Sequence, residues 1–510
     1  MLKMNWMTGH DGRLVATWNQ SDEPGFAGCR EATIMLKLKW AMDRDGRLVA
    51  IPVQSGENTP SEGRVEAEIS WSILRKTLLL LIWVLMVVPT LALAQDAESA
   101  APSAGQAWDV HFQSTVVGQG HPSFSAEYSG ANSLTPGAST RETISVDVTG
   151  GARLWHGGEF FGDVLMWQGY GLNNSLGLAA FPNSEAYRIG KTYPDVYLCR
   201  AYLRQTIGFG GGKVASDDGL GGKKDVRNLT LTIGHFSAKD IFDTNAYAND
   251  GRSQFMNWVL VANGAWDYPA NTLGFTNGLA AEMNTQAWSG RVGIFQVSQV
   301  ANGVRMDWNL THAWSAVGEV ERRYTFSGHA GAVRLLAFDT RSHMGNYQQT
   351  IDNPSLGENI ALTGAYRYKY GFGLNMEQEI RKDLGVFARL GWNDGKNQTY
   401  EFTDVDRTAT AGLSLKGSRW RRPDDIVGLA VIINGISAVH QQYLAAGGLG
   451  ITVGDGALDY TAERVVEAYY DWKISKHFQL TPDYQFAQDP AYNRVRGPVD
   501  ILALRFHSEF

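Results

Sequence analysis

The sequence predicts an all-β chain that folds into an antiparallel transmembrane β-barrel. Three observations support this prediction: apolar and polar residues alternate over long stretches, an export signal precedes them, and the chain ends on an amphipathic strand. In that last strand the shared, mostly apolar face comprises Leu502, Leu504, Phe506, Ser508 and Phe510. Terminal residues of soluble domains usually fray. We therefore expect this strand to be held on both sides, by its hairpin partner and by the first strand of the barrel.

The composition favours a large antiparallel β protein. The 510 residues include 57 glycines and 11% aromatic residues, a mixture that suits many strands and turns. A net charge of −7 gives no basic footprint, so we expect no nucleic-acid partner. Of the two cysteines, only Cys199 would remain after removal of an export signal, and we expect it to be a small buried apolar residue.

The export signal is the stretch "LRKTLLLLIWVLMVVPTLALAQD", which we assign to a signal peptide over residues 74–94. Two basic residues precede an apolar run, and small residues at Ala92 and Ala94 form the expected cleavage motif before Gln95. The run is too short for a membrane helix, which needs about 20 apolar residues. Because residue 95 is not cysteine, we expect no lipoprotein anchor, and we expect residues 95–510 to form the mature barrel.

Residues 1–73 precede the predicted signal peptide and show no sustained periodicity, although "DGRLVA" occurs twice, at Asp11–Ala16 and Asp45–Ala50. We interpret this segment as an over-extended gene prediction or an unstructured extension. The alternative is a cytoplasmic extension in front of a membrane anchor.

The clearest alternation lies in two predicted hairpins. The apolar faces of the first are Leu374, Met376 and Ile380, then Leu384, Val386, Ala388, Leu390 and Trp392. The apolar faces of the second are Val466, Ala468, Tyr470, Trp472 and Ile474, then Phe478, Leu480, Tyr484 and Phe486. The opposite faces are rich in charges of both signs. Pro482 lacks a backbone donor, so we expect a β-bulge there.

A soluble sandwich would also alternate, so the distribution of turns matters. Short turns such as "RKD" and "ISKH" contrast with long glycine-rich stretches such as residues 208–228, which we expect to be an outer loop. Residues 95–510 suit a barrel of roughly 14 to 18 strands at about ten residues per strand.

Four stretches together resemble the OprB-type carbohydrate-selective porins of Gram-negative bacteria. They are Phe242–Phe275, Leu384–Gly395, Gly447–Gly456 and Leu480–Phe510. The resemblance implies a sixteen-stranded outer-membrane barrel that passes sugars by passive diffusion. The final strand also resembles the terminal strand of outer-membrane proteins, which implies that Phe506 and Phe510 are read by the barrel-assembly machinery.

Alternation assigns a set of polar residues to the lumen, where charged groups offer donors and acceptors to sugar hydroxyls. The set is Glu377, Glu379, Arg381, Arg389, Glu467, Asp471, Asp483 and Gln485. The alternative for each residue is ordinary lining of a polar interior. The stretch "FDTNAYANDGRSQF" is a candidate loop folded into the lumen, with Asp243, Asn245, Tyr247, Asp250 and Arg252 as candidate sugar contacts. Its alternative is a turn network that stiffens the loop. Trp258, Trp266 and Tyr268 are candidate sugar platforms, although a role in loop packing or the interfacial girdle is the preferred interpretation.

The sequence gives little support for other chemistry. The glycine-rich stretches lack phosphate-loop spacing, the eleven histidines lack metal-ligand spacing, and no nucleophile elbow is present. We therefore expect no cofactor, no metal and no enzyme, and predict a carbohydrate porin with small sugars and outer-membrane lipid as partners. A general or acid-permeating porin remains an alternative, as does a secreted β-rich sugar-binding protein or glycosidase. Monomer and trimer both remain open.

Overall fold

The computed structural model describes residues 3–8, 14–19, 38–42, 48–52, 105–186, 190–216, 220–402 and 404–510. The chain divides into two compact units, Met1–Ala94 and Gln95–Phe510. In the first unit, β1 (Lys3–Thr8) pairs with β2 (Leu14–Asn19), and β3 (Leu38–Met42) pairs with β4 (Leu48–Pro52). Each second strand begins at the leucine of a "DGRLVA" repeat. The predicted signal peptide and its cleavage site, Ala94–Gln95, lie outside the described residues.

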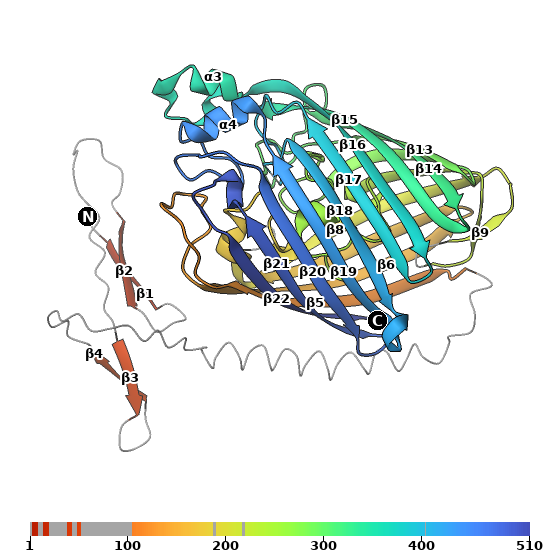
Figure 1. Cartoon of the computed structure of the whole chain (residues 1–510), viewed down its shortest axis with the longest axis horizontal. Helices are drawn as coiled ribbons and strands as arrows, with labels where there is room; N and C mark the ends of the chain where they lie inside the picture. Colours follow the sequence, from red (N-terminus) through yellow and green to blue (C-terminus); the bar gives the residue numbers. More distant parts are fainter. Residues whose placement is uncertain are drawn as a thin grey trace. The chain divides into compact units, whose positions relative to one another are not determined.

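Within the described part of the second unit, sixteen antiparallel strands close into a barrel, as predicted (Figure 1). The barrel strands are β5 (Trp108–His121), β6 (Ser139–Trp155), β7 (Gly158–Gly169), β8 (Lys191–Gly208), β11 (Asn228–Phe236), β12 (Thr276–Asn284), β13 (Trp288–Phe295), β14 (Trp314–Phe326), β15 (His329–Met344), β16 (Ala365–Arg381), β17 (Leu384–Asn393), β18 (Arg407–Gly417), β19 (Arg422–Gly435), β20 (Glu463–Lys473), β21 (Phe478–Gln488) and β22 (Val499–Glu509). Because the barrel is closed, every strand is hydrogen-bonded to a neighbour on each side, and the sheet has no open edge.

The terminal strand closes the barrel, which explains why the chain keeps its alternation to the end. β22 pairs with β21 on one side and with β5 on the other. The Phe510 N–H donates to the Phe112 carbonyl at 2.8 Å, and the Phe112 N–H donates back at 3.0 Å. The Phe510 ring stacks on His477 at 4.7 Å between ring centroids. The prediction that the last strand is held on both sides is therefore confirmed.

Side chains alternate between the lumen and the outer surface, as the two predicted hairpins required. On β20, Val466 is 36% exposed on the outside, whereas its neighbour Glu467 is 0% exposed in the interior. Cys199 is also buried. No helix among the described residues combines the length and the apolar character needed to cross a bilayer.

One barrel end carries mostly short turns and the other carries long connections. The helices are η1 (Leu172–Ser175), η2 (Ser184–Ala186), η3 (Ala238–Asp240), α2 (Trp258–Val261), α3 (Tyr347–Ile351), η4 (Pro354–Leu356), η5 (Ile360–Thr363), η6 (Ser418–Trp420), α4 (Ala438–Ala445) and η7 (Pro490–Tyr492). All of these helices except η6 lie in the long connections. The longest connection, residues 237–275 between β11 and β12, folds into the lumen, and we call it the internal loop.

Three details of the sequence analysis are wrong. Residues 209–227 join β8 to β11, which pair with each other, so this long connection lies at the short-turn end and not among the outer loops. It contains the hairpin of β9 (Lys213–Ala215) and β10 (Lys223–Asp225). No bulge occurs at Pro482, because β20 and β21 keep one register on both sides of it.

The third error concerns Arg381. A register shift between Glu379 and Arg381 inserts one extra residue into β16 and places Arg381 opposite Leu384. Leu384 belongs to the outward, apolar set of β17, so Arg381 lies with it on the outer surface. Simple alternation fails here because a bulge changes the face of every residue that follows it.

Candidate functional site: the inner wall and the internal loop

The internal loop is anchored at Asp243, which has a left-handed backbone conformation (φ 55°). The Asp243 N–H donates to the Glu319 carboxylate of β14 at 2.8 Å. Its own carboxylate accepts from Asn375 of β16 at 2.7 Å and from Arg389 of β17 at 3.2 Å. One residue of the loop thus contacts three strands of the wall.

Arg389 is the counterpart of Asp243 and is 0% exposed. Its guanidinium also donates to the carbonyl oxygens of Leu260 and Ala248 in the loop, both at 2.7 Å. A buried guanidinium needs an anion and several acceptors, and here the loop backbone supplies most of the acceptors. Arg389 therefore binds the loop and is shielded from the channel.

The segment after Asp243 runs along β16 and β17. The Asn245 amide donates to Asn375 at 2.8 Å, and the Ala246 N–H donates to the Glu377 carboxylate at 2.7 Å. Tyr247 lies over Gly385, where an added Cβ would stand 2.0 Å from the tyrosine ring. The pKa of Tyr247 is raised mainly by burial and, to a smaller extent, by the negative charge of Glu377. A glycine is needed on β17 because the ring takes the place of a side chain.

The far part of the loop is held by β20 and β21. The Glu467 carboxylate accepts from the backbone N–H groups of Met256 and Asn257 at 2.5 and 3.1 Å. The Asn257 amide donates to Gln485 of β21 at 3.0 Å, and its side-chain oxygen caps α2 by accepting from the Val259 N–H. These buried contacts fix the loop across the lumen.

The two acids predicted beside Glu467 are also buried. Asp483 accepts from Gln485 at 3.1 Å, and Asp471 accepts from the Thr481 hydroxyl at 2.9 Å. Asp483 thus joins the Glu467 network through Gln485, whereas the Asp471 bond stays within the β20–β21 hairpin.

Asp250 and Arg252 form a third attachment. Asp250 accepts from the Arg252 N–H at 3.0 Å and from the Ser253 hydroxyl at 2.6 Å, which closes a local turn. The Arg252 guanidinium pairs with Asp147 of β6 and donates to Glu185 at 2.9 Å. Asp250 thus closes a turn within the loop, and Arg252 joins the loop to β6 and η2.

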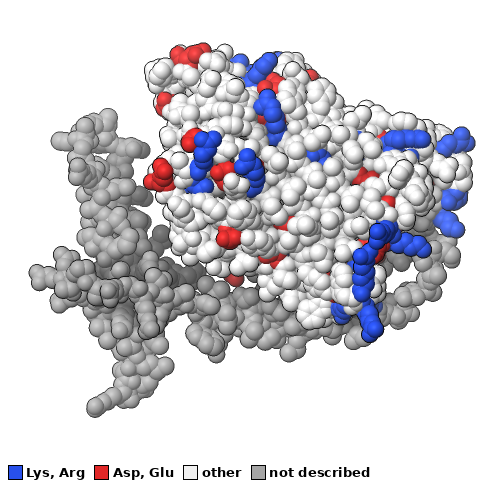
Figure 2. All heavy atoms as spheres, in the orientation of Figure 1, with Lys and Arg blue, Asp and Glu red and all other residues white. Residues whose placement is uncertain are grey.

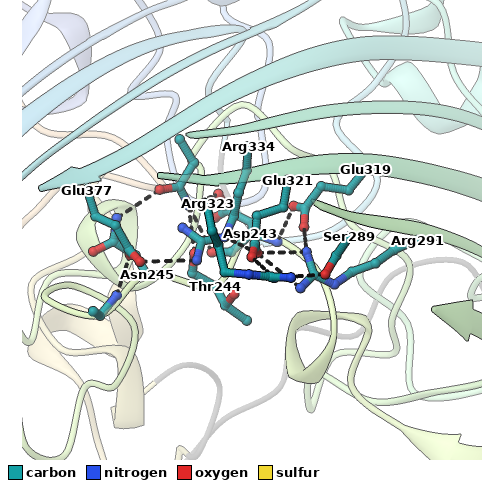
Figure 3. A network of polar contacts seen from close by, with 12 residues as sticks. Asp243, Thr244, Asn245, Ser289, Arg291, Glu319, Glu321, Arg323, Arg334 and Glu377 are labelled. Carbon is teal, nitrogen blue, oxygen red and sulfur yellow. Dashed lines mark hydrogen bonds and ion pairs between the residues drawn. The ribbon is translucent and has the colours of Figure 1, made fainter. Parts of the chain in front are cut away.

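The inner wall over β13–β16 carries a ladder of paired charges that sequence reasoning missed (Figure 3). Arg291 donates to Glu319 at 2.6 Å and to Glu321 at 3.0 Å. Glu321 also pairs with Arg323, and it accepts from Arg334 at 2.9 Å. The signal was visible as the inward alternation of Glu319, Glu321 and Arg323 in "GEVERRYTF".

The ladder ends at Glu377, which accepts from Arg334 at 3.2 Å. Two cavities lie beside the ladder, on the short-turn side of the internal loop. The first measures about 680 Å³, and Asp240, Thr244, Arg291 and Arg323 are among its lining residues. The second measures about 660 Å³ and is lined by Tyr247, Arg323, Arg334, Glu377 and Glu379, among others.

The candidate aromatic platforms pack against other rings. Tyr268 stacks on Phe402 with centroids 4.6 Å apart, and Trp258 lies 5.9 Å from Tyr268. Trp266 lies 5.4 Å from Tyr268 in the same buried cluster. These three side chains therefore pack the loop, which was the preferred interpretation. In the described part of the chain, no group of three His, Cys, Asp or Glu residues lies together as metal ligands would.

Comparisons with known proteins agree with this architecture. The chain is 24% identical over 288 residues to the porin AaxA of Chlamydia muridarum, a match that covers 54% of this chain and 51% of the relative. The chain thus spans about half the length of that curated relative. The high-pH structure of Pseudomonas putida OprB has the same fold, with a TM-score of 0.62 and 17% identity over 79% of this chain and 94% of that one. The model of the carbohydrate-selective porin, OprB family, matches residues 131–510, more than half of the sequence, and the chain belongs to that family.

Proposed function

We propose that this barrel lets small neutral sugars diffuse passively across the outer membrane along the inner wall of β13–β16. The family is one of channels rather than enzymes. The observation that carries the proposal is the ladder of paired Arg and Glu side chains beside the two cavities. Each arginine of the ladder has a carboxylate partner, which limits its attraction for free ions. The wall still offers hydrogen-bond donors and acceptors that suit hydroxyl groups.

Within this proposal, the predicted site residues divide into two roles. Tyr247, Glu377 and Glu379 border a cavity and contact sugar, together with Arg323 and Arg334. A second set holds the internal loop in place and thereby limits the width of the passage: Asp243, Asn245, Asp250, Arg252, Arg389 and Glu467. Asp483 and Asp471 support this set indirectly. Asp483 acts through Gln485, which accepts from Asn257, and Asp471 acts through Thr481, which accepts from Arg505 beneath the loop. A sugar passing such a wall is bound only weakly, as conduction requires.

Planar-bilayer conductance of the detergent-purified protein tests the proposal, with mono- and disaccharides added in steps. Stepwise channels that sugar blocks reversibly support it. Channels without block point to a general or acid-permeating porin instead. A folded protein that forms no channels would return the question to a sugar-binding protein or glycosidase.

Two adjacent arginines provide a matched pair of variants. Arg323 lines both cavities, whereas Arg322 lies on the outer surface with its guanidinium 4.8 Å from the Trp288 ring. Loss of one hydrogen bond to a sugar hydroxyl is worth about 1 kcal/mol, so Arg323→Met should weaken sugar block about fivefold. Arg322→Met should leave the block unchanged. Equal effects of the two substitutions would place the sugar contact elsewhere.

The route to the membrane completes the proposal. Residues 74–94 act as a signal peptide, and cleavage leaves Gln95 as the first residue. Phe506 and Phe510 then present the final strand to the barrel-assembly machinery. N-terminal sequencing of the purified protein tests the cleavage: a first residue of Gln95 supports it, and a first residue upstream of Leu74 contradicts it.

A further inference from the structure

Three turns at the short-turn end carry an excess of positive charge that contrasts with the whole chain. Residues 381–383, 416–425 and 473–477 contain eight lysines and arginines but three aspartates. The full sequence has a net charge of −7. Figure 2 shows basic side chains gathered at the barrel end where the C-terminus lies in Figure 1.

These turns are neighbours in space. The Lys416 N–H donates to the Asp383 carbonyl at 2.8 Å, which joins the first turn to the second. The Arg422 guanidinium donates to the Lys473 carbonyl at 2.8 Å, which joins the second to the third. The positive charge therefore forms one patch, which we call the basic rim.

The aspartates of the basic rim do not neutralise it. Asp383 pairs with Arg419 at 3.1 Å, and Asp425 pairs with Arg422 at 2.8 Å. Within the described residues, four exposed cations of the rim have no carboxylate within ion-pair distance: Arg381, Lys382, Lys416 and Arg421. Unpaired cations at the edge of a membrane protein are available to an external anion.

Outward-facing aromatic rings lie at the second and third turns of the rim. The Trp420 indole donates to the Tyr470 hydroxyl at 3.2 Å, and the Arg422 guanidinium lies 5.9 Å from the Trp472 ring. Trp420 is 37% exposed and Trp472 is 43% exposed. Farther along β19 the outward residues are apolar, with Leu429 and Val431 exposed. Tryptophan and tyrosine rings between an apolar band and a row of cations mark the depth of lipid headgroups.

We propose that the basic rim binds the phosphate headgroups of anionic phospholipids in the leaflet that meets the short-turn end of this outer-membrane barrel. The bulge of β16 serves this surface, because it turns Arg381 outward and adds its charge to that of Lys382. The cations border the apolar band itself, which places them where lipid phosphates lie. A soluble acidic protein would have no contact with that band.

The test compares binding of phosphatidylglycerol and phosphatidylcholine with identical acyl chains to the detergent-purified protein, measured by native mass spectrometry. The variant Arg381→Gln/Lys382→Gln/Arg421→Gln removes three of the four unpaired charges. The control Arg305→Gln/Lys396→Gln/Arg407→Gln removes three exposed charges at the opposite end. Each cation near a membrane surface contributes about 1 kcal/mol, or about fivefold in affinity for an anionic lipid.

We expect the unmodified protein and the control to prefer phosphatidylglycerol. In the rim variant, the ratio of phosphatidylglycerol binding to phosphatidylcholine binding should fall at least tenfold. Competition by inorganic phosphate alone should be much weaker, because the aromatic and apolar contacts need the whole lipid. Equal binding of the two lipids to the unmodified protein would overturn the proposal. So would a preference that survives in the rim variant but disappears in the control. Unchanged heat-modifiable migration confirms that both variants are folded.

Discussion

Replacing Arg389 by methionine should release the internal loop from β17. The substitution keeps a long side chain but removes the charge, so Asp243 is left as an unpaired buried carboxylate. The hydrogen bonds from the guanidinium to the carbonyl oxygens of Ala248 and Leu260 are lost as well. Removing one partner of a buried ion pair typically destabilises the folded state by about 3–5 kcal/mol. We expect the attachment of the loop to be destabilised and not the barrel, because the methionine side chain would still occupy an inward position of an intact strand ladder.

Single-channel recording in planar bilayers is the assay for this change. With the barrel closed and the loop loosened, Arg389→Met should give larger and noisier conductance steps than the unmodified protein. The double variant Asp243→Asn/Arg389→Met removes both charges, so its conductance steps should lie closer to those of the unmodified protein. Arg322→Met serves as a control on the outer surface. Conductance and heat-modification midpoint both unchanged in Arg389→Met would refute the role assigned to this side chain.

Three further predictions concern the lumen, the strand that closes the barrel and the internal loop. Gly385→Ala places a Cβ 2.0 Å from the Tyr247 ring, so the ring must move and sugar block in bilayers should change; identical block would show that Tyr247 does not border the path. Phe510→Ala removes the ring stacked on His477 at 4.7 Å and should lower the yield of heat-modifiable barrel in outer membranes, whereas a normal yield would contradict the assembly role. Burial lowers the pKa of Lys239 to about 8, so the folded protein holds fewer protons than the unfolded chain between pH 8 and 10.5, and stability should rise with pH across that window. Lys239→Met should abolish this rise in a comparison of thermal midpoints, and a rise that persists would assign it to another group.

The sequence alone determined the barrel and its faces. Alternation in β17, β20 and β21, and in β16 as far as its bulge, predicted which residues point outward, because a strand places successive side chains on opposite sides. The terminal Phe510 predicted closure, since an apolar-faced strand at a chain end needs a partner on each side. Candidate residues such as Glu467 and Arg389 were found in the interior for the same reason.

Only the tertiary structure decided what the interior residues do. Glu467 and Glu377 look alike in the alternating pattern, yet Glu467 is sealed under the internal loop while Glu377 borders a cavity. Arg381 shows the same limit, because one inserted residue in β16 reversed its face. Periodicity reports which side of a strand a residue occupies. Whether a loop more than a hundred residues away in sequence covers that side depends on contacts such as Arg389 to Ala248, which no local pattern encodes.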